Sequence, residues 1–127
     1  MNKNTAINIS CLLLALAVGL GAFGAHALRE ILTERQLEVW QTGVSYHFYH
    51  SIGILLLTLI YILRPNKWLS RAILLLFTGV ILFSGSLYLL TTLEWSFLGP
   101  VTPIGGVAFI IGWLIAIPGL RQAAEHA

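Results

Sequence analysis

The sequence AILLLFTGVILFSGSLYLLTTL at residues 72–93 contains no charged side chain and is long enough to cross a membrane. A helix needs about 20 residues to span a hydrocarbon core of about 30 Å. Runs such as Leu74-Leu75-Leu76 lack the strict alternation of polar and apolar residues that a transmembrane β-strand requires. Residues 72–93 therefore predict a transmembrane α-helix, because a helix satisfies its own backbone hydrogen bonds in lipid.

Three further uncharged stretches accompany this one. We expect membrane spans at residues 5–27, 42–63, 72–93 and 103–120. Pro65 suits the end of the second span, and Pro103 suits the first turn of the fourth. Thr33 and Gln36 have the spacing of a capping box that opens the second helix. The sequence thus predicts an all-α membrane protein, a four-transmembrane-helix bundle that forms one membrane domain over residues 1–127.

The composition agrees with a protein whose outer solvent is lipid. The chain has 127 residues, of which 57% are hydrophobic and 9% are charged, whereas a soluble domain has about 25% charged residues. The net charge is +2, and the basic residues form no patch interleaved with aromatic residues, so nucleic-acid binding is not expected. Cys11 is the only cysteine, which excludes an internal disulfide.

The distribution of basic residues predicts the orientation of the chain. With four spans, the two termini and the middle loop lie on one side of the membrane. That side carries Lys3, Arg64, Lys67, Arg71 and Arg121, whereas the other carries Arg29 and Arg35. The positive-inside rule therefore places both termini in the cytoplasm. In an alternative interpretation, residues 1–27 are a signal peptide cleaved after the pattern Ala25-His26-Ala27, although its uncharged run is long for such a peptide.

A short amphipathic segment is expected between the first two spans. Within residues 29–42, the carboxylates of Glu30, Glu34 and Glu38 recur at every fourth residue, while apolar side chains follow another face. This pattern predicts a segment at the membrane surface, where a solvated stripe of charge explains the carboxylates.

Small residues at helical spacing predict close packing of three of the four helices. They are Ala17, Gly21 and Ala25 in the first span, Gly85 in the third, and Gly105, Ala108, Gly112 and Ala116 in the fourth. Any such face that the bundle does not use is available to a second copy of the chain or to another membrane protein.

Several motifs occur in an order that resembles a known family. They are Gly21-Ala22-Phe23-Gly24-Ala25-His26, Tyr46-His47 with His50, Gly85-Ser86-Leu87-Tyr88, Pro103-Ile104-Gly105-Gly106 and Gly112-Trp113. This set, which covers almost the whole chain, resembles the bacterial domain-of-unknown-function family 423, the YgdD-like small inner-membrane proteins, which are similar to the eukaryotic transmembrane protein 256 family. The resemblance implies a four-helix protein of the bacterial inner membrane and implies no reaction.

Three histidines are candidates for a site in the outer leaflet. His26 lies near the outer end of the first span, and His47 and His50 lie on one face near the start of the second. Polar groups within a membrane are costly, so each is a functional candidate. Tyr88 and Glu94 are the candidates from the third span.

Four roles for these histidines remain open. In the first role, the histidines are structural and form hydrogen bonds between helices. In the second, His26, His47 and His50 together bind a transition metal. Alternatively, haem or a quinone docks against a histidine, or the histidines relay protons with Glu30 or Glu94. The segment Ser84-Gly85-Ser86 lacks the nucleophile-elbow pattern, and no other enzyme motif is present. We therefore expect a non-enzymatic accessory or scaffold protein, with a metal- or haem-binding protein as the alternative.

Overall fold

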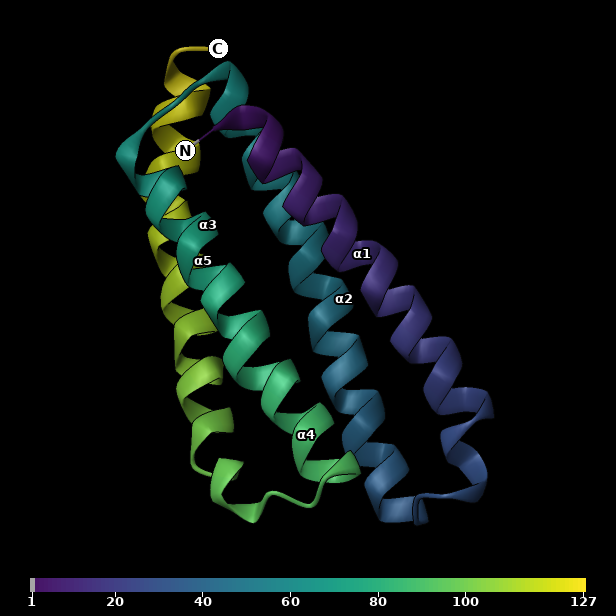
Figure 1. The fold of residues 1–127 in the computed structure, drawn as a ribbon. Helices are drawn as coiled ribbons and strands as arrows, with labels where there is room; N and C mark the ends of the chain where they lie inside the picture. The colour runs from purple at the N-terminus through teal and green to yellow at the C-terminus, as the bar shows by residue number, and fades with distance from the viewer. Residues whose placement is uncertain (1) are drawn as a thin grey trace.

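Four long helices run through residues 2–127, which the computed structural model describes (Figure 1). They are α1 (Lys3–His26), α2 (Glu34–Leu63), a third helix composed of α3 (Lys67–Gly79), a π-helical segment η2 (Val80–Gly85) and α4 (Ser86–Thr92), and α5 (Val101–Glu125). Two short 3-10 turns, η1 (Leu28–Glu30) and η3 (Ser96–Leu98), lie in the connections. In this part of the chain, four helices are long and apolar enough to cross a membrane, which confirms the predicted fold class.

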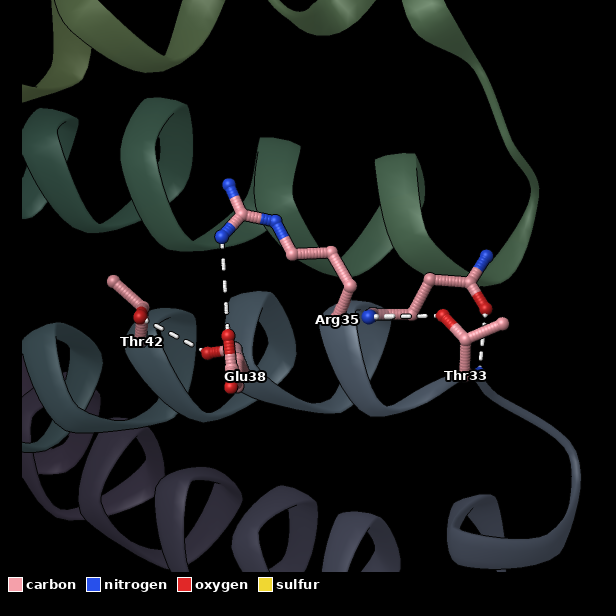
Figure 2. A network of polar contacts seen from close by, with 5 residues as sticks. Thr33, Arg35, Glu38 and Thr42 are labelled. Carbon is pink, nitrogen blue, oxygen red and sulfur yellow. Dashed lines mark hydrogen bonds and ion pairs between the residues drawn. The ribbon is translucent and has the colours of Figure 1, made fainter.

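Three of the four long helices begin at residues whose side chains cap them, and α5 is the exception. The Asn2 side chain accepts hydrogen bonds from the first backbone N–H groups of α1, and the Asn66 side chain does the same for Leu69 in α3. At the start of α2, the Gln36 backbone N–H donates to Thr33 Oγ1 at 3.2 Å, and the Thr33 backbone N–H donates to Gln36 Oε1 at 2.9 Å (Figure 2). This reciprocal pair is the predicted capping box.

The connection between α1 and α2 is shorter than the amphipathic pattern suggested. Residues 27–33 link the two helices through η1, and the expected surface segment from Glu34 onward forms the first turns of α2. The helix starts early because the capping box at Thr33 initiates it, and no proline interrupts the chain before Leu63. The carboxylates of Glu34 and Glu38 thus belong to an extension of the second transmembrane helix.

The helices form two hairpins that meet along α2. α1 packs along α2, α3 packs along α5, and α2 also contacts α3, η2 and α4. Both chain termini and the α2–α3 turn lie at the same end of the molecule, and the other two connections lie at the opposite end (Figure 1). This arrangement is the one that the predicted topology requires.

The α3–α5 hairpin buries most of the predicted small residues. Gly105, Ala108, Gly112 and Ala116 of α5 are all buried against α3 and η2. A Cβ atom at Gly105 would overlap the backbone nitrogen of Phe83, so this position tolerates only glycine without movement of the backbone. Gly85 is different, because a Cβ atom there would meet no atom within 4 Å.

The α1–α2 hairpin uses a different register from the predicted one. Ala17 is buried and Gly21 is half-buried, but Ala25 is exposed and the neighbouring Gly24 is buried instead. The indole of Trp40 lies directly over Gly24, and a Cβ atom at Gly24 would collide with it. Ala25 is therefore turned away from α2 by the rotation of the helix.

Two open grooves separate α1 from the third helix. The groove that we call the His47 groove has a volume of about 400 Å³ and lies between α1 and the η2–α4 segment. A second groove of about 400 Å³, between α1 and α3, is lined by Ala6, Ile9, Ile54, Ile73 and Leu74 among others. Because of these grooves, α2 is the helix that provides most of the packing for α1.

Candidate functional site

His47 lies at the centre of a polar contact between α2 and α4. Its side chain is 3% exposed, and its Nδ1 atom is 2.9 Å from the hydroxyl of Tyr88. Its Nε2 atom has no hydrogen-bond partner among residues 2–127. The backbone of Leu13 in α1 approaches the same imidazole, so His47 lies between α1, α2 and α4.

His50 faces a different neighbour, although it is only three residues away. Its Nδ1 atom is 2.7 Å from the carbonyl oxygen of Tyr46 on its own helix, which makes Nδ1 the donor. Its ring stacks on Phe109 of α5, with ring centroids 3.5 Å apart and planes inclined by 14°. His50 thus packs α2 against α5, whereas His47 joins α2 to α4.

The structure does not bring the three candidate histidines together. His26 is exposed on the last turn of α1 and lies on the side that faces away from α2. Within the described chain, no group of three or more histidine, cysteine or acidic side chains is placed to hold a metal ion. Glu30 and Glu94 are exposed, and no hydrogen bond joins either carboxylate to a histidine within residues 2–127. The residues present therefore do not fit the three-histidine metal site.

A second polar contact joins the same helices near His47. The Ser84 hydroxyl, which is completely buried in η2, donates to the carbonyl oxygen of Gly43 at 2.7 Å. Ser86 and Thr102 hydroxyls are 2.5 Å apart and connect the start of α4 to α5. Buried hydroxyls need such partners in lipid. Together with His47 and Tyr88, Ser84, Ser86 and Thr102 form a polar seam that connects α2, the third helix and α5.

The π-helical segment gives this seam its geometry. Val80–Gly85 inserts a wider turn between α3 and α4, and segments of this kind are rare and frequent at functional sites. Within this third helix, η2 contacts both α5 and α2, and Ser84 of η2 and Tyr88 of α4 are the residues that hydrogen-bond to α2. The sequence contains no local signal for this turn.

The outward face of α1 is a feature that the sequence analysis missed. Seven exposed residues at spacings of three and four lie opposite α2: Asn4, Asn8, Cys11, Ala15, Gly19, Ala22 and His26. All of them are small or polar, and a Cβ atom at Gly19 would meet nothing within 4 Å. The sequence shows small or polar residues at helical spacing from Asn8 to Ala22. Only the structure shows that this face of α1 is exposed, because it shows which side of α1 packs on α2.

Comparison with known proteins identifies the family. The family model described as a protein of unknown function (DUF423) matches residues 20–106. The chain belongs to this family. It is 48% identical over 103 residues to the UPF0382 membrane protein YwdK of Bacillus subtilis, covering 80% of this chain and 84% of that protein. It is 38% identical over 116 residues to the UPF0382 inner membrane protein YgdD of Escherichia coli, covering 86% of each. No solved structure matches the chain significantly.

The part of the chain that matches the DUF423 family contains the whole polar seam. Its residues Gly43, His47, Ser84, Ser86, Tyr88 and Thr102 all lie within residues 20–106. The first two-thirds of α1 and most of α5 lie outside the matched range. The seam of this chain thus lies within the matched range, and the family's description assigns no activity to it.

Proposed function

We propose that this DUF423 protein is a non-enzymatic accessory protein of the bacterial inner membrane, which presents α1 to a transmembrane helix of another subunit. The outward face of α1 carries the proposal. Lipid-facing positions have no need for small side chains, whereas helix–helix interfaces in membranes are enriched in them, and amide groups can hydrogen-bond across such interfaces. On α1, Ala15, Gly19 and Ala22 supply a smooth surface, and Asn8 supplies an exposed amide.

The rest of the bundle supports α1 as the docking helix. The small-residue face of α5 is already occupied by α3 within the same chain. By contrast, α1 packs mainly along α2, and its opposite face is free. The large exposed side chains Leu12 and Phe23 flank the smooth face on one side, and Val18 flanks it on the other. A partner helix would fit between these two ridges.

Site-specific photo-crosslinking in native membranes tests this function. A photoreactive residue at Ala15 or Ala22 should give an adduct of discrete mass with another polypeptide, which mass spectrometry would then identify. The matched control is Ile110 of α5, which is 62% exposed and should crosslink to lipid alone. Equal, diffuse lipid adducts from all three positions would contradict the proposal.

The proposed orientation places both termini in the cytoplasm. The end of the molecule that carries the termini contains five of the seven basic residues, and the positive-inside rule supports the cytoplasm for that end. A reporter that is active only in the periplasm should stay silent when it is fused after Ala127 and become active when it is inserted after Arg29. The reverse pattern would show that the orientation is wrong.

A further inference from the structure

The second groove, between α1 and α3, combines apolar walls with one cationic side chain. We call it the Arg71 groove, because Arg71 and its neighbour Ser70 line it at the end nearer the start of α3. A volume of about 400 Å³ is within the range of roughly 300–1,000 Å³ that is typical of ligand sites. The rest of the lining is apolar and includes Ile9 of α1, Ile54 of α2, and Leu74 and Phe77 of α3.

The charge of Arg71 is not compensated within the chain. Arg71 is exposed, and among residues 2–127 no ion pair joins its guanidinium to a carboxylate. No acidic residue lines the groove. Four of the five acidic residues of the sequence belong to the opposite end of the molecule, and Glu125 of α5 is the fifth. The Arg71 groove therefore presents a free positive charge beside an apolar surface.

Trp68 indicates that Arg71 lies at the level of the lipid head groups. The Cζ atom of Arg71 is 5.7 Å from the centroid of the Trp68 ring, and the Nζ atom of Lys67 is 5.2 Å from it, so both cations contact the indole. Indole rings are enriched at the boundary between head groups and hydrocarbon. Phe77, which lines the other end of the groove, is six residues further along α3, or about 9 Å deeper at 1.5 Å per residue.

We infer that the Arg71 groove binds one anionic phospholipid, with the lipid phosphate against Arg71 and one acyl chain between α1 and α3. The order of groups in the groove matches that of the lipid, because the cation lies at the boundary and the apolar side chains lie below it. A guanidinium can donate to two phosphate oxygens at once. Basic pockets between transmembrane helices recognise anionic head groups in this way.

The charges at the groove select an anionic head group over a zwitterionic one. Both kinds of lipid carry the phosphate, but a zwitterionic head group adds a cation. That cation would lie near Lys67 and Arg71, which carry the same charge, and would find no carboxylate in the lining of the groove. The apolar walls in turn favour a lipid over a soluble phosphate ester, which has no chain to cover them.

Native mass spectrometry of the full chain in mild detergent tests the inference with two lipids that have the same acyl chains. The probes are dioleoylphosphatidylglycerol, which is anionic, and dioleoylphosphatidylcholine, which is zwitterionic. We expect one phosphatidylglycerol to bind with a dissociation constant at least about fivefold lower than that of phosphatidylcholine. Equal dissociation constants for the two lipids would overturn the inference.

The substitution Arg71→Gln tests the contribution of the cation. It removes the charge and keeps a polar side chain, so the dissociation constant of phosphatidylglycerol should rise about fivefold, the effect of one basic residue near an anionic head group. Arg121→Gln is the matched control, because Arg121 is exposed on α5 and does not line the groove. An equal rise in both variants would show attraction by the overall charge and would overturn the defined site.

A third variant tests the apolar part of the groove. Ile9→Trp places an indole in the groove and should weaken the binding of phosphatidylglycerol at least as much as Arg71→Gln does. Ile110→Trp is the control, because Ile110 is 62% exposed on α5 outside the groove, and a thermal melt of each variant establishes that it is folded. Unchanged binding in a folded Ile9→Trp variant would overturn the inference. Displacement of the lipid by an equal concentration of glycerol 1-phosphate would also overturn it, because the acyl chain would then have no part in the site.

Discussion

In the α3–α5 hairpin glycines bring two backbones together, whereas in the α1–α2 hairpin large side chains fill the space between the helices. Gly105 and Gly119 of α5 lie directly against the backbone of the third helix. On the other side of the molecule, Trp40 and Val44 of α2 cover the small residues of α1. Membrane helices gain little from the hydrophobic effect and associate through close packing and hydrogen bonds. The comparison indicates a self-contained hairpin beside one that has a free outer face and borders an open groove.

The largest effect should follow from a methyl group in the α3–α5 contact. Gly105→Ala places a Cβ atom against the backbone of Phe83 and 2.8 Å from the carbonyl carbon of Leu82. Backbone atoms cannot move aside as a flexible side chain can, so we expect a loss of about 3 kcal/mol or more in a thermal melt in mild detergent. Gly106→Ala is the neighbouring control, because its Cβ atom would be 3.8 Å from Phe83 and should be tolerated. Equal melting curves for the two variants would show that the hairpin is looser than described.

A smaller effect is expected for the same change in the α1–α2 contact. In Gly24→Ala the new methyl group collides with the Trp40 indole, whose Nε1 atom donates to the Leu20 carbonyl oxygen at 3.0 Å. The indole can move, at the cost of this hydrogen bond, so a loss of about 2 kcal/mol is expected in the same melt. Gly19→Ala should leave the melting temperature unchanged, because Gly19 faces away from α2. A destabilised Gly19→Ala variant would place α1 in a different rotation.

The two polar contacts at the start of α2 should contribute different amounts to the free energy of unfolding (Figure 2). Thr33→Ala removes the N-cap and should cost about 1 kcal/mol. Arg35→Ala removes an exposed ion pair with Glu38 at 3.8 Å and should cost less than about 0.5 kcal/mol. Chemical denaturation in detergent would measure both. A larger loss for Arg35→Ala than for Thr33→Ala would mean that charge, not capping, fixes the start of this helix.

A similarly small effect is expected in the polar seam. Tyr88→Phe deletes the hydroxyl that bonds His47 and changes little else, so a loss of about 0.6 kcal/mol is expected, the average for hydrogen bonds between membrane helices. Tyr49→Phe is the control, since Tyr49 is 62% exposed. If both variants have the melting temperature of the wild type, the His47–Tyr88 hydrogen bond does not stabilise the packing of α2 against α4.

Features that depend on local sequence were predictable. The uncharged stretch at residues 72–93 and the capping pair Thr33 and Gln36 are local signals, so the helical fold class and the start of α2 follow from them. The small residues of α5 were also predictable as one face, because Gly105 and Gly112 repeat at a helical period.

Features that depend on helix rotation were not predictable. Gly24 and Ala25 differ by about 100° around α1, and the sequence supports either as the packed position. His47 and His50 share one helix face by spacing, yet they contact α4 and α5 separately because α2 lies between those helices. The π-helical turn shifts the register of α4, and no sequence pattern in Val80–Gly85 predicts it.

Disulfide crosslinking in membranes tests the contrast between the hairpins most directly. In a Cys11→Ser background, Leu75→Cys with Gly112→Cys joins α3 to α5, where the two Cβ positions are 3.3 Å apart, close to the separation of about 3.5–4.5 Å in disulfides. Leu16→Cys with Leu89→Cys lies on opposite walls of the His47 groove. Rapid oxidation of the first pair and little of the second is the expected result. Equal oxidation of both pairs would contradict the account, because α1 would then close against α4 and leave no groove between them.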